Sequence, residues 1–85
     1  MQQIKKFTDL DLSSYLLCKG IKEVSPPVFD GTHIFFCFPD TPEVDKEVLN
    51  FFSGSVQVDV QTFSSHLRRL RLIVLEMRRG GMKNV

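Results

Sequence analysis

The residues with the clearest capacity for chemistry in this 85-residue sequence are arginines, and they gather near its C-terminal end. Residues 67–85 hold six basic residues and one acidic residue, a net charge of +5, and five of the six are arginines. Residues 1–66 hold five basic and nine acidic residues, a net charge of −4, so the whole chain carries only +1. Guanidinium groups donate paired hydrogen bonds to phosphates and carboxylates, so the C-terminal segment carries side chains that are able to bind either group.

A long helix is expected to carry these arginines. Apolar residues at successive steps of four, three, four and three predict one face of a helix. They are Phe63, Leu67, Leu70, Val74 and Met77. We expect Asp59 or Thr62 to cap the start of this helix and Gly80-Gly81 to end it. At about 100° per residue, most of the arginines fall on the neighbouring arc, with two leucines among them. The candidate binding residues are Arg68, Arg69, Arg71, Leu72, Leu75, Arg78 and Arg79.

Three interpretations of this arginine-rich face remain open. Exposed leucines between arginines are typical of a contact surface, which favours a protein partner or a second copy of the chain in a homodimer. The same arginines are able to bind nucleic acid, although a net charge of +1 and a pI near 7.8 make a duplex less compelling. Alternatively, the arginines form a solvated face that Glu43, Asp45 and Glu47 partly neutralise, while the predicted hairpin buries the leucines.

Metal binding is weakly supported by the sequence. The candidate ligands Cys18, Cys37, His33 and His66 include no pair at the two-residue spacing of zinc ribbons. His33 and Cys37 are four residues apart, which on a strand is about 13 Å and too far for one ion. We therefore expect no metal and interpret both cysteines as buried thiols.

Catalysis is also weakly supported. Ser64, Ser65 and His66 lie within one helical turn near the expected helix start, where serines typically assist capping. No glycine-rich phosphate loop is present in the sequence. A chain of this length has little core to spare for enclosing a substrate. We expect no enzyme activity, no cofactor and no small-molecule substrate.

Length and composition predict one domain spanning residues 1–85, with a frayed tail from about residue 80 to 85. The chain is 42% hydrophobic and 25% charged, which is a globular composition. No apolar run approaches the roughly 20 residues needed to cross a bilayer. We expect a cytoplasmic protein with no membrane partner.

The first half of the chain predicts a helix followed by a hairpin. A helix is expected over residues 9–19, with Thr8 as its cap and Gly20 as its stop. Pro26-Pro27 removes two donors from the following strand, which must therefore lie at a sheet edge. Asp30-Gly31 predicts a two-residue hairpin turn. The apolar arm over residues 32–38 is expected to lie at the centre of the sheet.

The second half predicts two helices with a short segment between them. Thr41 is expected to cap the first of these helices, with Pro42 in its first turn and Gly54 at its exit. Its predicted buried stripe is Val44, Val48, Phe51 and Phe52. Residues 55–60 alternate in polarity and are consistent with a brief strand. These elements together predict an α+β fold in the order α-β-β-α-(β)-α, with a small antiparallel sheet built on the hairpin and packed by three helices.

Helix starts, a phenylalanine-rich strand and glycine stops together carry a resemblance to a known family. The segments are Phe7-Thr8-Asp9-Leu10, Tyr15-Leu16-Leu17-Cys18-Lys19-Gly20, His33-Ile34-Phe35-Phe36-Cys37-Phe38, Ser53-Gly54 and Val58-Asp59, followed by Phe63 and Leu67. Over residues 6–72 the chain resembles a group of small domains of unknown function from bacterial, archaeal and phage or mobile-element genomes. Val60 departs from the family pattern, in which a proline often follows the aspartate. The resemblance implies a small cytoplasmic domain in a phage or mobile-element setting, with no reaction assigned.

Overall fold

Three helices and three strands make up the protein in the computed structural model, which describes residues 3–80. In chain order they are β1 (Ile4–Phe7), α1 (Leu10–Cys18), β2 (Ser25–Phe29), β3 (Ile34–Pro39), α2 (Pro42–Ser53) and α3 (Val60–Arg78). The predicted α+β fold is confirmed, with its three helices and its antiparallel sheet. The predicted tail lies outside the described residues, apart from Gly80 at its start.

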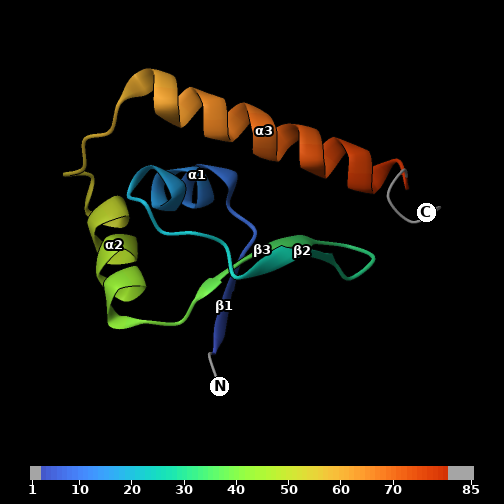
Figure 1. Ribbon diagram of the computed structural model, residues 1–85, viewed down its shortest axis with the longest axis horizontal. Coiled ribbons are helices and arrows are strands. Elements are labelled where there is room, and N and C mark those ends of the chain that lie inside the picture. The colour runs from blue at the N-terminus through green and yellow to red at the C-terminus, as the bar shows by residue number, and fades with distance from the viewer. Residues whose placement is uncertain (1–2, 81–85) are drawn as a thin grey trace.

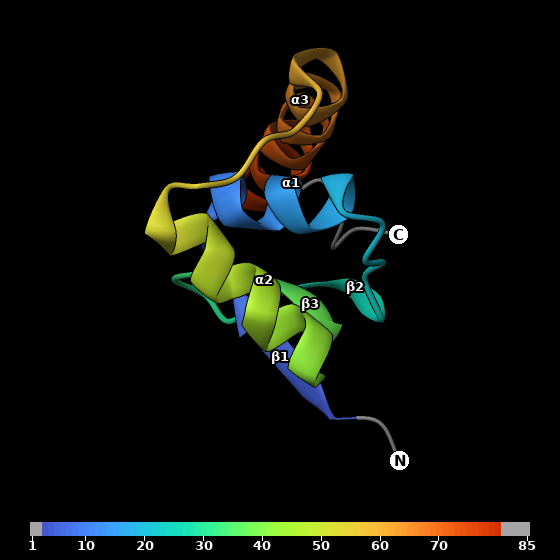
Figure 2. The ribbon, with the colours of Figure 1, turned by 90° about the vertical axis from the view of Figure 1, so that its left-hand side faces the viewer.

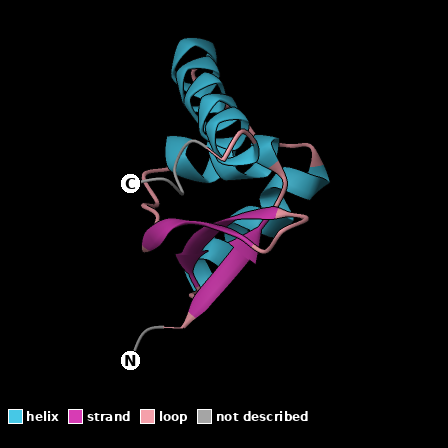
Figure 3. Ribbon diagram, turned by 90° about the vertical axis from the view of Figure 1, so that its right-hand side faces the viewer, coloured by secondary structure: helices cyan, strands magenta, loops and turns pink. Residues whose placement is uncertain are grey.

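The sheet has the strand order β1-β3-β2, and both pairings are antiparallel. Strand β3 is central, as predicted, and four of its side chains are completely or almost completely buried: Ile34, Phe36, Cys37 and Phe38. Strand β2 is an edge, as its proline pair requires, and the register shifts between Ser25 and Val28, where Pro26 and Pro27 lie. Figure 3 shows the three strands gathered on one side of the helices.

Strand β1 was not predicted, and the optional strand over residues 55–60 is absent. Strand β1 forms by pairing with β3 about thirty residues later, where Phe7 lies opposite Phe36. Residues 55–59 have no helix or strand, although Val56 and Val58 are half-buried and pack on the core. Because β1 and β2 already occupy both edges of β3, the alternating segment has no free position beside the central strand.

The hairpin is confirmed, but its connection is longer than the predicted two residues. Phe29 lies opposite Ile34, which leaves residues 30–33 between the strands. The Asp30 carboxylate accepts hydrogen bonds from the backbone N–H groups of Thr32 at 2.8 Å and His33 at 2.6 Å. Gly31 has a φ of 97°, which side chains strongly disfavour. An Asx turn therefore forms this loop, because the aspartate side chain takes the place of a backbone acceptor.

Helix α1 is the central element of the molecule and lies between the sheet and α3 (Figures 1 and 2). Leu12, Tyr15 and Leu16 are at most 2% exposed, and the hydroxyls of Ser13 and Ser14 are buried without a hydrogen-bond partner. Its cap is Asp9, which accepts from the Leu12 N–H at 3.0 Å, and not the predicted Thr8. The aspartate carboxylate is one residue closer to the free amides of the first turn.

Helix α2 begins and ends as predicted. Thr41 accepts from the Val44 N–H at 3.3 Å, Pro42 opens the first turn, and Gly54 ends the helix with a φ of 78°. The predicted buried stripe is correct for Val44, Val48 and Phe51. It is wrong for Phe52, which is 67% exposed. A step of one residue turns a helix by about 100°, so only one of two adjacent phenylalanines is able to face the core.

Helix α3 is the longest element and packs mainly against α1, across the top of the molecule in Figure 1. Its cap is Asp59, which accepts from the Thr62 N–H at 2.8 Å, so the helix begins at Val60 without a proline. Leu70 is completely buried. The other predicted core residues are half-buried: Phe63, Leu67, Val74 and Met77. One side of α3 is therefore anchored and the opposite side faces solvent.

Candidate binding face on helix α3

The seven predicted binding residues are all exposed on α3. Leu72 and Leu75 are 57% and 45% exposed, so the hairpin does not bury them. Each residue turns the helix by about 100°, and Leu70 marks the side that faces the core. Measured around the helix axis, a set of five of these residues lies about 100–180° away from Leu70. We call this set the α3 outer face, and it consists of Arg68, Arg71, Leu72, Leu75 and Arg79. Arg78 lies at its border, beside Arg71.

Arg69 points to a different side of the helix. Its Nη2 lies 3.5 Å from the Oε1 of Glu23, which belongs to the loop after α1 and is 18% exposed. This ion pair ties α3 to the body of the domain. Arg69 therefore lies apart from the other predicted binding residues, and its contact is with Glu23 of the same domain.

The arginines of the α3 outer face have few carboxylate partners. Arg79 lies 3.8 Å from Glu76, an exposed pair one helical turn apart that contributes little. In the described part of the chain, Arg68, Arg71 and Arg78 have no carboxylate oxygen within 4.0 Å. Their guanidinium groups are therefore able to accept an external anion without first breaking an ion pair.

The acidic residues of α2 have other contacts. Lys5 Nζ lies 2.7 Å from Asp45 Oδ1 and 3.9 Å from Asp40 Oδ1, and these acids raise the pKa of Lys5. Glu47 accepts a hydrogen bond of 2.6 Å from the hydroxyl of Tyr15. No ion pair between residues 3 and 80 joins α2 to an arginine of α3. Any partial neutralisation of the arginines by Glu43, Asp45 and Glu47 therefore acts without an ion pair among the described residues.

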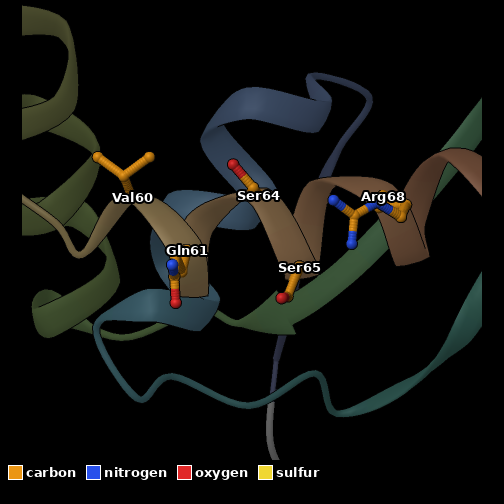
Figure 4. Close-up of a pocket in the computed structure, with 5 residues that line it drawn as sticks. All are labelled: Val60, Gln61, Ser64, Ser65 and Arg68. Carbon is orange, nitrogen blue, oxygen red and sulfur yellow. The ribbon is translucent and has the colours of Figure 1, made fainter.

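A shallow hollow lies over the N-terminal half of the α3 outer face. Ser64, Leu67, Arg68 and Arg71 line about 220 Å³ of it. An adjoining hollow shares Ser64 and Arg68 (Figure 4). In this view the guanidinium of Arg68 extends back along the helix toward the turn that carries Ser64 and Ser65. Sequence reasoning treated these serines as capping residues, although Ser64, Arg68 and Arg71 are spaced four and three apart and share a helix face.

The cysteines and histidines do not form a comparable site. Cys18 is half-buried, and burial, followed by the charge of Asp59, raises the pKa of its thiol. A raised pKa leaves less of the nucleophilic thiolate at neutral pH. Cys37 is buried in β3. Within residues 3–80, no three His, Cys, Asp or Glu side chains are grouped closely enough to hold a metal ion.

No helix between residues 3 and 80 combines the length and the apolar composition that crossing a bilayer requires.

Comparison with known families gives one match. A family model described as "Domain of unknown function (DUF5659)" matches residues 2–75, which include all of the sheet, α1, α2 and most of α3. No curated protein and no solved structure matches the chain significantly. The matched region ends at Leu75 and thus contains both leucines of the outer face.

Proposed function

We propose that this chain, which belongs to the DUF5659 family, is a non-catalytic module that binds an acidic protein partner through the α3 outer face. The exposure of Leu72 and Leu75 between arginines supports this role more than any other feature. Both leucines point away from the core that Leu70 anchors, so their exposure contributes nothing to the fold of the domain itself.

The leucines favour a protein over other anionic partners. Complete burial of a leucine side chain is worth about 1.5–3 kcal/mol, so covering two roughly half-exposed leucines yields about 2 kcal/mol. A protein surface with its own apolar residues is able to provide this cover. The phosphates and sugars of a nucleic acid backbone are polar and provide much less of it.

The arginines favour an acidic protein over a second copy of the chain. Arg68, Arg71 and Arg79 surround the leucines, so two α3 outer faces brought together would place like charges in close contact. A carboxylate-rich partner would instead meet the guanidinium groups of Arg68 and Arg71, which have no carboxylate oxygen within 4.0 Å among residues 3–80. Self-association through α3 is therefore the less favoured form of the same protein-binding role.

Nucleic-acid binding is the second candidate function. It is favoured by the absence of carboxylates within 4.0 Å of Arg68, Arg71 and Arg78 among residues 3–80. Each phosphate contact of this kind would contribute to an affinity that falls steeply with salt. The small net charge of +1 and the two exposed leucines argue against it as the main role.

The cellular setting is a separate part of the proposal. We place the protein in the cytoplasm and in a phage or mobile-element context, on the basis of the resemblance noted from the sequence. Phage or transposition genes next to the coding sequence would support this setting, and a conserved housekeeping neighbourhood would contradict it.

The binding role is tested by capture from the native host with matched variants. Leu72→Ser with Leu75→Ser removes the apolar part of the face, and Arg68→Gln with Arg71→Gln removes its charge. Leu49→Ser is the control, because Leu49 is 72% exposed on α2, away from the α3 outer face. We expect one acidic protein to be captured by the wild type and the control and to be lost with both double variants.

Two further measurements separate the alternatives. Light scattering across a range of concentrations reports a dimer, and the leucine double variant should abolish that dimer if the partner is a second copy. Binding to mixed-sequence DNA or RNA between low and physiological salt reports nucleic-acid recognition. Capture that is unchanged by both double variants would show that the α3 outer face is not the binding surface.

A further inference from the structure

The hollow on α3 is lined by two arginines and a serine. Ser64, Arg68 and Arg71 are separated by four and then three residues, which puts neighbouring Cβ atoms about 5–6 Å apart on one face. Arginine side chains on a helix lean toward its N-terminus, and Figure 4 shows the Arg68 guanidinium extending back along the helix toward the turn of Ser64 and Ser65. Half-buried Leu67 completes the lining of the hollow.

The polar side chains that line this hollow are suited to an anion. Its charged groups are both cationic, and its remaining polar side chain, Ser64, is able to donate a hydrogen bond. Neither arginine has a carboxylate oxygen within 4.0 Å in the described structure. Two arginines that line one hollow repel each other unless an anion lies between them, so this lining favours a ligand of concentrated negative charge.

We infer that the hollow lined by Ser64, Leu67, Arg68 and Arg71 binds a single phosphate group carried by the polypeptide partner. A phosphate presents several strong acceptor oxygens, which match two guanidinium forks and one hydroxyl. A carboxylate has two oxygens and a single charge, and it satisfies fewer of these donors. The phosphate itself is inferred from the hollow, whereas its polypeptide carrier rests on the proposed function.

A polypeptide carrier is favoured by what lies next to the hollow. Leu75 is four residues beyond Arg71 on the α3 outer face, and Leu72 lies beside it. A phosphorylated segment with apolar residues after the phosphate would fill the hollow and cover the leucines at the same time. A nucleic acid backbone would place further phosphates over Leu72 and Leu75, whose apolar side chains have no hydrogen-bond donor to offer them.

The site is tested first with inorganic phosphate in an NMR titration of the full chain. We expect saturable shifts of the Ser64 amide and of the Arg68 and Arg71 Nε signals, with a dissociation constant on the order of 1 mM. Arg68→Gln should weaken binding about tenfold, because it removes a charge-assisted hydrogen bond. The matched control is Arg78→Gln, which removes a cation outside the hollow and should bind like the wild type.

Two results would overturn the site. One is a phosphate response that does not saturate and spreads equally over Arg78 and Arg79. The other is equal affinity for phosphate in the Arg68→Gln and Arg78→Gln variants. Both would show general attraction to a cationic helix, and unchanged amide spectra of the variants would exclude unfolding as the cause.

The carrier is tested with a phosphoserine peptide that has leucines after the phosphate, its unphosphorylated form and a single-stranded oligonucleotide. We expect the phosphopeptide to bind most tightly and to lose affinity in Arg68→Gln and in Leu72→Ser with Leu75→Ser. Only the arginine variant should also weaken inorganic phosphate binding. Tighter binding of the oligonucleotide than of the phosphopeptide would overturn the polypeptide carrier.

The same experiments distinguish failure of this site from failure of the proposed function. If inorganic phosphate binds in the hollow but the leucine and arginine double variants both still capture every partner, the proposed protein binding through the α3 outer face fails and the phosphate site stands. If a protein partner depends on the leucines but phosphate does not saturate the hollow, the phosphate site fails and the binding role stands.

Discussion

Replacing Tyr15 with phenylalanine should destabilise the protein measurably without changing its packing. The Tyr15 ring is 1% exposed, and its centroid lies 5.4 Å from that of Phe51. Phenylalanine retains this ring and removes only the hydroxyl, which donates a 2.6 Å hydrogen bond to Glu47. The hydroxyl thus joins the central helix α1 to α2 by one charge-assisted bond.

The expected size of the effect follows from this bond. A hydrogen bond to a charged group is worth about 1.5–3 kcal/mol, so Tyr15→Phe should lower the free energy of unfolding by about 2 kcal/mol. For a domain of this size, that corresponds to a fall in Tm of roughly 8–16 °C. Urea unfolding followed by circular dichroism measures the free energy, and a thermal melt measures the Tm.

The pH dependence gives an independent check. The hydrogen bond from Tyr15 is the main cause that lowers the pKa of Glu47 below its ordinary value of 4.5. A carboxyl whose pKa is lower when folded stabilises the protein above pH 4.5, and this stabilisation is lost as pH falls through the folded pKa. Burial, and then the bond to Glu47, raises the pKa of Tyr15 to about 12. That stabilisation is present below pH 10 and is lost as pH rises through about 12.

A double-mutant cycle isolates the bond. Tyr15→Phe and Glu47→Gln should each destabilise the protein, and the combined variant should cost less than the sum of the two. The Tyr15→Phe variant should also lose stability less steeply than the wild type as pH falls below 4.5. A change in unfolding free energy below about 0.5 kcal/mol, or an unaltered acid profile, would refute a stabilising role for this contact.

Three further substitutions test other parts of the fold by urea unfolding. Ser14→Ala should raise the free energy of unfolding by about 1 kcal/mol, because it removes a buried hydroxyl that has no hydrogen-bond partner. A lower free energy of unfolding in this variant would instead show that the hydroxyl makes a stabilising hydrogen bond. Leu70→Ala should lower the free energy of unfolding by about 2–5 kcal/mol, since Leu70 is the one fully buried residue of α3 within the described chain. A loss below about 1 kcal/mol would contradict the role of Leu70 as the anchor of α3. Gly54→Ala should lower the free energy of unfolding by about 1–2 kcal/mol, because the φ of 78° is unfavourable for alanine even though the added Cβ would meet no atom within 4 Å. Gly54→Asn should lower it less, because asparagine adopts this conformation more readily. Equal losses for the two variants would argue against a conformational cause.

Local signals in the sequence predicted much of the fold. The Thr41-Pro42 start and the Gly54 exit of α2 depend only on residues within one helical turn. The central position of β3 follows from its apolar residues, which no exposed strand tolerates. Strand β1 escaped prediction because its four residues form a strand only by pairing with β3, far along the chain. The alternation in residues 55–60 was misleading for the same reason, because a strand also needs a free neighbour.

The α3 outer face was predictable because helix periodicity alone sets which residues share a side. That rule placed Leu72 and Leu75 together with Arg68 and Arg71, and the exposure of all four agrees with it. The pairing of Arg69 with Glu23 was not predictable, since it depends on where the loop after α1 lies. The hollow beside Ser64 was missed because its shape depends on side-chain conformations, including that of Arg68, which the sequence does not specify.

The proline pair of β2 also protects the sheet from uncontrolled growth. An exposed strand edge can recruit a further strand from another molecule, which is a common first step toward aggregation. Pro26 and Pro27 have no N–H to offer such a strand, and the register shift beside them interrupts the ladder. The opposite edge strand, β1, has only four residues and includes the charged Lys5 and Lys6. With both borders of the sheet poorly suited to recruiting a foreign strand, intermolecular recognition is directed to the helical side of the molecule.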